Sequence, residues 1–179
     1  GQLRSNSAVP SSTFSISTPS TKAKNAQWDF YAQLQFNTSG ANFVDVYLVS
    51  EQSDLLSTTN NGYFVRIGGT PDEISLYKMT AGVASVLING TDGVTNRSNN
   101  LLRIKIIRDA NNLWSLELDA SGGTNYILEG TATDNSFSTS SFFGIRIQQS
   151  TATFFNKHFF DDIYAGDIMT EKDPPVLSS

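Results

Sequence analysis

The segment Glu117-Leu118-Asp119 comes closest to a pair of catalytic carboxylates in this sequence. Residues two apart in an extended strand face the same side, so both acids would point together. Hydrolysis of a glycosidic bond requires two carboxyl groups about 5–5.5 Å or about 6.5–9.5 Å apart. We interpret the pair as two solvated carboxylates at the end of a strand and keep a glycoside hydrolase as a minor alternative.

His158 is the only histidine, and the sequence contains no cysteine. The absence of cysteine excludes disulfides, thiolate zinc sites and thiol catalysis. A Ser-His-Asp triad would need His158, but Asp162 lies four residues away, more than ~10 Å along a strand. We therefore predict a partly exposed strand histidine and a protein that is not an enzyme.

Asp161 and Asp162 are the strongest candidates for metal ligands. Adjacent residues of a strand face opposite sides, so one of the two acids faces the core or a bulge. A buried carboxylate needs a partner. A structural calcium ion would serve, and so would backbone N–H groups or an arginine. Both alternatives stay open, and no other cofactor is predicted.

Polar and aromatic side chains occupy the outward positions of several predicted strands. Sugars offer apolar C–H faces and hydroxyl edges, so aromatic rings beside amides, carboxylates and guanidinium groups suit them. If the strands share a sheet, these residues form one ligand-binding row: Tyr31, Gln33, Asp45, Tyr47, Arg66, Arg103, Glu117 and Arg146. The loops at residues 51–61 and 89–100 are alternative binding surfaces. Ordinary cross-strand pairing on a solvated sheet is the competing interpretation.

The elements that must position these residues are strands. In residues 28–36 one face carries Trp, Phe, Ala, Leu and Phe, and the other carries Asp, Tyr and two Gln. This period of two recurs in eight or more segments, whereas a period of 3.6 is almost absent. The pattern predicts an all-β, two-sheet antiparallel sandwich, with Trp28 and Trp114 in its core. The predicted strands cover one or two segments within residues 3–20, then 27–37, 43–50, 63–68, 74–79, 83–89, 102–106, 114–118, 126–130, 143–147 and 158–166.

Length and composition limit the function classes. The chain has 179 residues, a net charge of −5 and no cluster of Lys or Arg, which argues against nucleic-acid binding. No run approaches the ~20 apolar residues of a membrane span. Only 16% of residues are charged, and the uncharged polar surface favours a secreted or cell-surface location. We predict one domain over residues 1–168 and a linker over 169–179, because the Pro174-Pro175 pair favours an extended chain leading to a following domain.

Three segments carry a resemblance to a known family: Trp28-Asp-Phe-Tyr31, Asn61-Gly-Tyr-Phe-Val-Arg-Ile-Gly-Gly-Thr70 with Glu73-Ile-Ser-Leu-Tyr77, and Phe159-Phe-Asp-Asp-Ile163. Across most of residues 25–168 the chain resembles the concanavalin A-like, laminin-G-like lectin-type modules of bacterial surface and secreted multidomain proteins. The resemblance implies a jelly roll that is usually non-catalytic and often binds glycans. It also implies that a first edge strand, upstream of Gly1, is missing from this chain.

The same resemblance bears on catalysis. Hydrolases with this fold carry Glu-x-Asp-x-x-Glu on one strand, whereas here Ala120, Ser121 and Gly122 follow Asp119 and the second glutamate is missing. We therefore predict a non-catalytic extracellular module, with an extracellular glycan or a cell-surface molecule as its partner. The main alternative is a structural spacer or adhesin domain that binds no small ligand.

Overall fold

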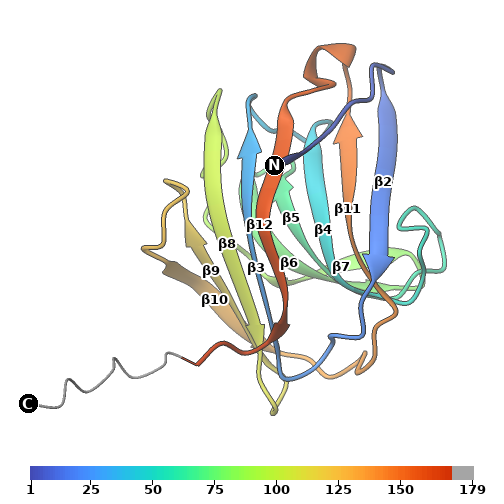
Figure 1. The fold of residues 1–179 in the computed structure, drawn as a ribbon, viewed down its shortest axis with the longest axis vertical. Coiled ribbons are helices and arrows are strands. Elements are labelled where there is room, and N and C mark those ends of the chain that lie inside the picture. Colours follow the sequence, from blue (N-terminus) through green and yellow to red (C-terminus); the bar gives the residue numbers. More distant parts are fainter. Residues whose placement is uncertain (171–179) are drawn as a thin grey trace, which may run out of the picture.

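The computed structural model describes residues 1–170 and has two antiparallel sheets of six strands each, packed face to face (Figure 1). Sheet A has the order β1-β12-β3-β8-β9-β10, and sheet B has the order β2-β11-β4-β5-β6-β7. The strands of sheet A are β1 (Leu3–Arg4), β12 (His158–Asp167), β3 (Ala26–Leu34), β8 (Asn100–Arg108), β9 (Leu113–Asp119) and β10 (Ile127–Thr133). Those of sheet B are β2 (Ser12–Pro19), β11 (Phe142–Gln149), β4 (Phe43–Ser50), β5 (Gly62–Gly68), β6 (Glu73–Thr80) and β7 (Val83–Ile88). The predicted all-β sandwich is confirmed.

The core consists of the inward residues of the two sheets. Trp28 of β3 and Trp114 of β9 are fully buried and stack with their ring centroids 5.8 Å apart. Phe30, Ile104 and Ile145 are also buried, as the alternation predicts. The period-two pattern thus identifies the inward side of each strand, because every second side chain of a half-buried sheet must avoid water.

The outward side is less uniform than the pattern predicts. In β3 and β8 the outward residues are partly exposed, whereas most of the outward residues of β4 are buried. The loop of residues 51–61 lies over part of the outer face of sheet B, where Leu55 packs on Tyr47, Phe64 and Met79. Outward therefore means partly solvated on β3 and β8 and largely covered on the central strands β4, β5 and β6, whereas the edge strands β2 and β7 are exposed.

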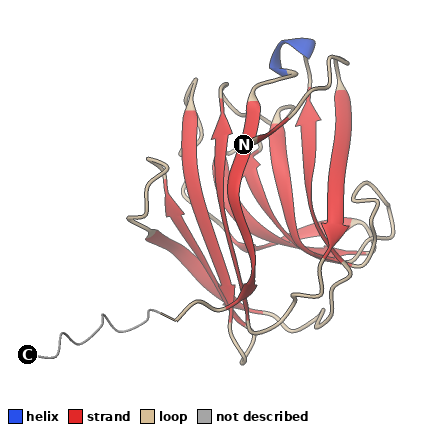
Figure 2. Ribbon diagram, viewed as in Figure 1, coloured by secondary structure: helices blue, strands red, loops and turns tan. Residues whose placement is uncertain are grey.

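Helical structure is confined to one short 3₁₀ turn, Ala152–Phe154, within residues 1–170 (Figure 2). Residues 52–57 form bends and turns within the loop that the sequence predicts there. No helix in the described part of the chain is long and apolar enough to cross a bilayer. Of the predicted linker, residues 171–179 lie outside the described residues.

Candidate functional site

The eight predicted ligand-binding residues do not form one row. Strand order divides them, because β3, β8 and β9 belong to sheet A while β4, β5 and β11 belong to sheet B. Tyr31, Gln33, Arg103 and Glu117 lie on the outer face of sheet A. Asp45, Tyr47, Arg66 and Arg146 lie together on the outer face of sheet B. The second group is the one that borders a cavity.

Three charged residues form a compact cluster on sheet B, which we call the Asp45 cluster: Asp45, Arg66 and Arg146. Their strands are neighbours, and register places Asp45 directly opposite Arg146 on one side and Arg66 on the other. Arg66 donates from Nε and Nη2 to the two carboxylate oxygens, at 2.7 and 2.9 Å, and Arg146 Nη1 donates at 2.7 Å. The carboxylate is fully buried, whereas each arginine side chain is 23% exposed.

The Asp45 cluster has more donors than it uses. Two guanidinium groups carry ten N–H donors, and three of these reach Asp45. Within residues 1–170 the remaining donors of Arg66 and Arg146 have no hydrogen-bond acceptor. One carboxylate also leaves one positive charge of the two arginines uncompensated. The cluster therefore offers oriented donors to a ligand.

Aromatic rings lie directly beside these donors. Tyr47, Phe64 and Tyr77 face one another across β4, β5 and β6 and stack at centroid distances of 5.0 and 5.1 Å. The Arg66 guanidinium lies 4.2 Å from the ring centroid of Phe43 and 5.3 Å from that of Tyr77. Such packing fixes the planar guanidinium and leaves its edge free for hydrogen bonding.

The loop between β4 and β5, residues 51–61, forms one wall of the site. Leu55 of this loop is buried against Tyr47, Phe64 and Met79. It reaches the sheet at Gly144, where a Cβ atom would lie 2.7 Å from Leu55 Cδ1. The same Cβ would lie 2.5 Å from the backbone oxygen of Ile16, which cannot move aside as a leucine side chain can, so this position requires glycine. The loop is also tied down at its far end, where Gly82 N donates to Asn60 O at 2.9 Å.

Between this loop and the sheet lies a cavity of about 140 Å³. It is lined by Tyr47, Leu55, Leu56, Ser57, Thr58, Met79, Gly82 and Arg146. Burial raises the pKa of Tyr47 to about 12, so its hydroxyl keeps its proton at neutral pH. The cavity is smaller than the ~300 Å³ at which pockets for drug-sized ligands begin.

The loop at residues 89–100 reaches this face at Gly90 and from Gly93 on runs along Pro71 and Asp72. Gly90 N donates to Ser75 Oγ at 2.9 Å, and Ser75 Oγ donates to Glu73 Oε1 at 2.7 Å. Glu73 is buried, and its Oε2 atom has no hydrogen-bond partner among residues 1–170. Leu55 of the first loop and Gly90 of the second therefore contact the outer face of sheet B.

The predicted residues on sheet A form surface pairs. Lys105 Nζ lies 2.6 Å from Glu117 Oε2, and Gln33 Nε2 donates to Asn99 Oδ1 at 2.8 Å. The guanidinium of Arg103 lies 5.8 Å from the centroid of the Tyr31 ring. These contacts are ordinary pairing on a solvated sheet, which is the competing interpretation that the sequence allows for these residues.

Glu117 and Asp119 interact with different partners. Glu117 forms the ion pair with Lys105, whereas Asp119 accepts hydrogen bonds from Ser121 Oγ and from the backbone N–H groups of Ser121 and Asn125. The Ser121 hydroxyl bond, supported by the backbone bonds, lowers the pKa of Asp119. An ionised carboxylate that closes a turn is a poor proton donor, which disfavours this pair as an acid–base couple.

Asp161 and Asp162 lie at a β-bulge, where the pairing of β12 with β3 is interrupted between Asp161 and Tyr164. Asp162 has a φ of 49°, and its N–H donates to Asp161 Oδ1 at 3.0 Å. Arg103 Nη2 donates to Asp162 Oδ2 at 2.7 Å. Among residues 1–170 no group of three or more His, Cys, Asp or Glu side chains could hold a metal ion. A calcium ion at this pair stays a prediction, and melting temperatures with calcium and with EDTA would test it.

The prediction for His158 is wrong in one respect, because the ring is fully buried rather than partly exposed. It packs edge-on against Phe36, with centroids 4.8 Å apart, and its Nδ1 lies 2.9 Å from Ser5 Oγ. Burial lowers the pKa of His158 to about 4. Loop residues 151–157 and the N-terminal segment cover this end of β12, and the sequence gives no sign of that cover.

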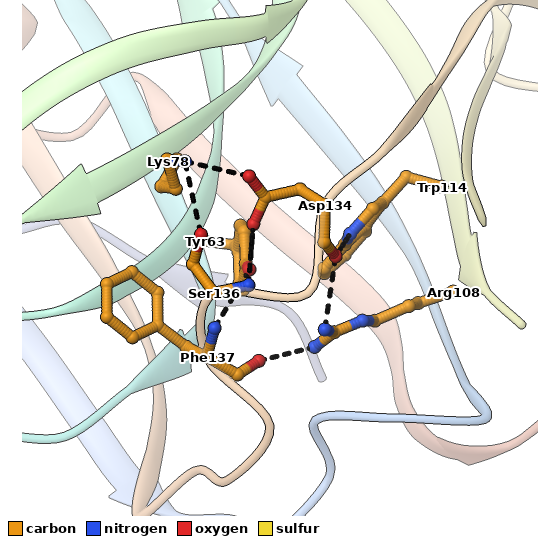
Figure 3. Close-up of polar contacts among 7 residues, drawn as sticks. All are labelled: Tyr63, Lys78, Arg108, Trp114, Asp134, Ser136 and Phe137. Carbon is orange, nitrogen blue, oxygen red and sulfur yellow. Dashed lines mark hydrogen bonds and ion pairs between the residues drawn. The ribbon is translucent and has the colours of Figure 1, made fainter. Parts of the chain in front are cut away.

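A second polar cluster, between the sheets at one end of the sandwich, contains none of the predicted binding or metal residues (Figure 3). Asp134, in the segment between β10 and β11, accepts hydrogen bonds from Tyr63 and from Lys78 Nζ, the latter at 2.7 Å. Arg108 is fully buried and donates to the carbonyls of Ala23, Phe137 and Asp134 and to Asn112 Oδ1. We call this group, with Trp114 and Ser136, the Asp134 cluster. It fixes the crossing from sheet A to sheet B.

Comparisons with known proteins agree on the architecture. No protein-family model matches the chain, and no curated protein matches it. Among solved structures, the carbohydrate-binding module CBM66 from Bacillus subtilis is 13% identical with a TM-score of 0.59, over 93% of this chain and 92% of that one. The exoplasmic/lumenal domain of VIP36, in a Ca²⁺/Man-bound form, is 13% identical with a TM-score of 0.65, over 96% of this chain and 80% of that one.

The galectin LEC-6 from Caenorhabditis elegans is also similar, at 8% identity and a TM-score of 0.51, over 92% of this chain and 95% of that one. At such identities the likeness describes the fold alone. The protein therefore has the concanavalin A-like, lectin-type β-sandwich fold that these carbohydrate-binding modules and lectins share.

Proposed function

We propose that the protein is a non-catalytic carbohydrate-binding module whose ligand lies on the outer face of sheet B. The observation that carries the proposal is the Asp45 cluster, where two partly exposed guanidinium groups keep free N–H donors beside stacked aromatic rings and a cavity. A sugar hydroxyl accepts such hydrogen bonds, and the apolar C–H face of a sugar packs on a ring. Tyr47 and Phe64 are fully buried, so the partly exposed ring of Tyr77 is the one that such a face could contact.

The buried carboxylate makes the donors effective. Asp45 holds Arg66 in a bidentate pair and anchors Arg146 from the other side, so neither guanidinium group has to be ordered when a ligand arrives. Preorganised groups cost less conformational entropy on binding. Ser57 and Thr58 of the covering loop add hydroxyl groups to the same cavity.

Sugar binding by neighbours of similar fold supports the proposal in general terms. CBM66 is named as a carbohydrate-binding module, and VIP36 is named in forms that contain Man. A secreted or cell-surface location, with an extracellular glycan as the partner, belongs to the same proposal and rests on the low content of charged residues. The alternative is a spacer or adhesin domain without a small ligand.

The proposal is tested by glycan-array screening, followed by calorimetric titration of the sugars that bind. Arg146→Met removes cavity donors and keeps much of the apolar stem, so we expect affinity to fall by at least about tenfold. Arg103→Met, on the outer face of sheet A, is the matched control and should leave affinity unchanged.

Two results would count against the proposal. Binding that is equally weakened by both substitutions would place the ligand elsewhere or reflect a general loss of structure, which circular dichroism of each variant distinguishes. An array without any signal at high protein concentration would favour the spacer alternative.

A further inference from the structure

We propose that the ligand of the site on sheet B is an acidic sugar, a uronic acid unit whose carboxylate binds Arg146 at the cavity between the loop of residues 51–61 and the sheet. This inference rests on the sugar site proposed above and adds the charge of its ligand. A neutral sugar of the same shape binds the site more weakly.

Arg146 keeps free the edge of its guanidinium group that matches a carboxylate. The protein itself contains an example of such a pair, because Arg66 donates from Nε and Nη2 to the two oxygens of Asp45, at 2.7 and 2.9 Å. Arg146 donates to the same carboxylate from Nη1 alone, at 2.7 Å. Its own Nε and Nη2 have no acceptor within residues 1–170. A second carboxylate can therefore bind Arg146 in the bidentate geometry that Asp45 has on Arg66.

The charge of the Asp45 cluster favours an anion at Arg146. Asp45 supplies one negative charge to two guanidinium groups, and its bidentate pairing with Arg66 leaves Arg146 the less compensated of the two. Both arginine side chains are mostly withdrawn from water, which therefore screens their charge less than it screens a fully exposed arginine. A ligand carboxylate at Arg146 gives each guanidinium group one bidentate anion.

The lining of the cavity supplies hydrogen-bond donors and no carboxylate. Its polar side chains are those of Tyr47, Ser57, Thr58 and Arg146, and none of the lining residues is Asp or Glu. The hydroxyl of Tyr47 keeps its proton, because burial raises its pKa to about 12, and it has no hydrogen-bond partner within residues 1–170. A carboxylate only accepts hydrogen bonds and can use these donors in full, whereas a neutral sugar hydroxyl also needs an acceptor for its own proton.

Apart from Asp45, the acidic residues of this part of the face and of its covering loop lie outside the cavity. Glu73 belongs to β6, which is three strands from β11 in sheet B, or ~14 Å across the sheet. Glu51 and Asp54 belong to the covering loop, but both are exposed, and each accepts a hydrogen bond from within that loop. The cavity is therefore locally positive, although the whole chain has a net charge of −5.

The test compares an acid with its primary amide, which keeps the shape of the sugar and removes its charge. The probes are the methyl glycosides of glucuronic and galacturonic acid and their amides, titrated by calorimetry at neutral pH. We expect at least one acid to bind at least about tenfold more tightly than its amide. In Arg146→Gln, which keeps a hydrogen-bonding side chain without the charge, the ratio of the two affinities should fall to about one. Arg103→Gln, on the outer face of sheet A, is the matched control and should keep the wild-type ratio.

The results separate this inference from the proposed function. Equal affinity for acid and amide, with both weakened in Arg146→Met, would overturn the acidic ligand and leave the sugar site in place. The same holds if neutral sugars bind on the array and the two acids do not. A preference for the acid that persists in Arg146→Gln would place the carboxylate elsewhere and also overturn the inference. No binding of any sugar would overturn both proposals. The comparison of acid with amide in the wild type needs no substitution, so it decides the question even if Arg146→Gln unfolds.

Discussion

The Asp45 cluster and the Asp134 cluster use the same kinds of side chain with opposite results. Each centres on one carboxylate, basic side chains and aromatic rings. In the Asp134 cluster, Arg108 donates four hydrogen bonds to acceptors of the protein. In the Asp45 cluster, most guanidinium donors have no acceptor within residues 1–170.

The difference lies in what surrounds each carboxylate. The segment between β10 and β11 brings backbone carbonyls to Arg108 and closes the Asp134 cluster (Figure 3). Over the Asp45 cluster the loop of residues 51–61 contributes apolar contacts and leaves a cavity beside Arg146. A cluster of basic side chains around a carboxylate therefore serves as a structural clamp where the guanidinium donors are used, and as a candidate binding site where they are free.

Removing the central cation of the closed cluster should have the largest effect. In Arg108→Met the carbonyls of Ala23 and Phe137 and the side-chain oxygen of Asn112 lose their partner inside the protein, while Asp134 O keeps Trp114 Nε1, so the free energy of unfolding should fall by about 3–5 kcal/mol. Urea denaturation measures this loss of stability. The control, Arg103→Met, breaks an exposed pair with Asp162 and should cost at most about 1 kcal/mol. Similar losses in both variants would contradict the distinction between clamp and surface pair.

Neither cluster contains a histidine, so His158 should determine how the free energy of unfolding depends on pH near pH 4 to 6.5. Its pKa is about 4 in the folded protein, against about 6.5 in an unfolded chain. A lowered pKa means that stability is complete above pH 6.5 and is lost as pH falls towards 4, by about 2–3 kcal/mol. Urea denaturation across this range should show the slope in the wild type and not in His158→Leu. A variant that keeps the full slope would rule out His158 as its source.

The sequence predicts the sandwich correctly because period two is a local property, visible within residues 28–36. It predicts the site only in part, because strand order is not local. β11 lies beside β4, so Arg146 reaches Asp45 across 101 residues of chain. The alternation of apolar and polar residues also does not show that β3 and β8 belong to sheet A while β4 and β11 belong to sheet B. Nor does it show that Leu55 docks on Gly144, a contact that only the folded loop creates.

The carboxylate of the closed cluster should titrate at low pH. The hydrogen bonds from Lys78 and Tyr63 outweigh desolvation and lower the pKa of Asp134 to about 2. Its stabilisation is therefore present above pH ~4 and lost as pH falls towards 2, by about 1–2 kcal/mol after allowance for partial exposure. Urea denaturation between pH 5 and 2 should show a smaller loss in Asp134→Asn. Asp162→Asn, whose side chain is exposed, should follow the wild type.

Removing one hydroxyl group should have the smallest effect on stability. It also gives the most direct comparison of the two clusters. Tyr63→Phe removes a donor to Asp134 and an acceptor for Phe137 N, so the free energy of unfolding should fall by about 1–2 kcal/mol. In Tyr77→Phe the ring beside Arg66 stays, and its hydroxyl has no hydrogen-bond partner within residues 1–170, so stability should change by less than about 0.5 kcal/mol. The two substitutions delete the same atom, and urea denaturation of both gives the difference. Equal losses would mean that the outer face of sheet B is as fully bonded as the clamp, and the free donors proposed for sugar binding would then be occupied.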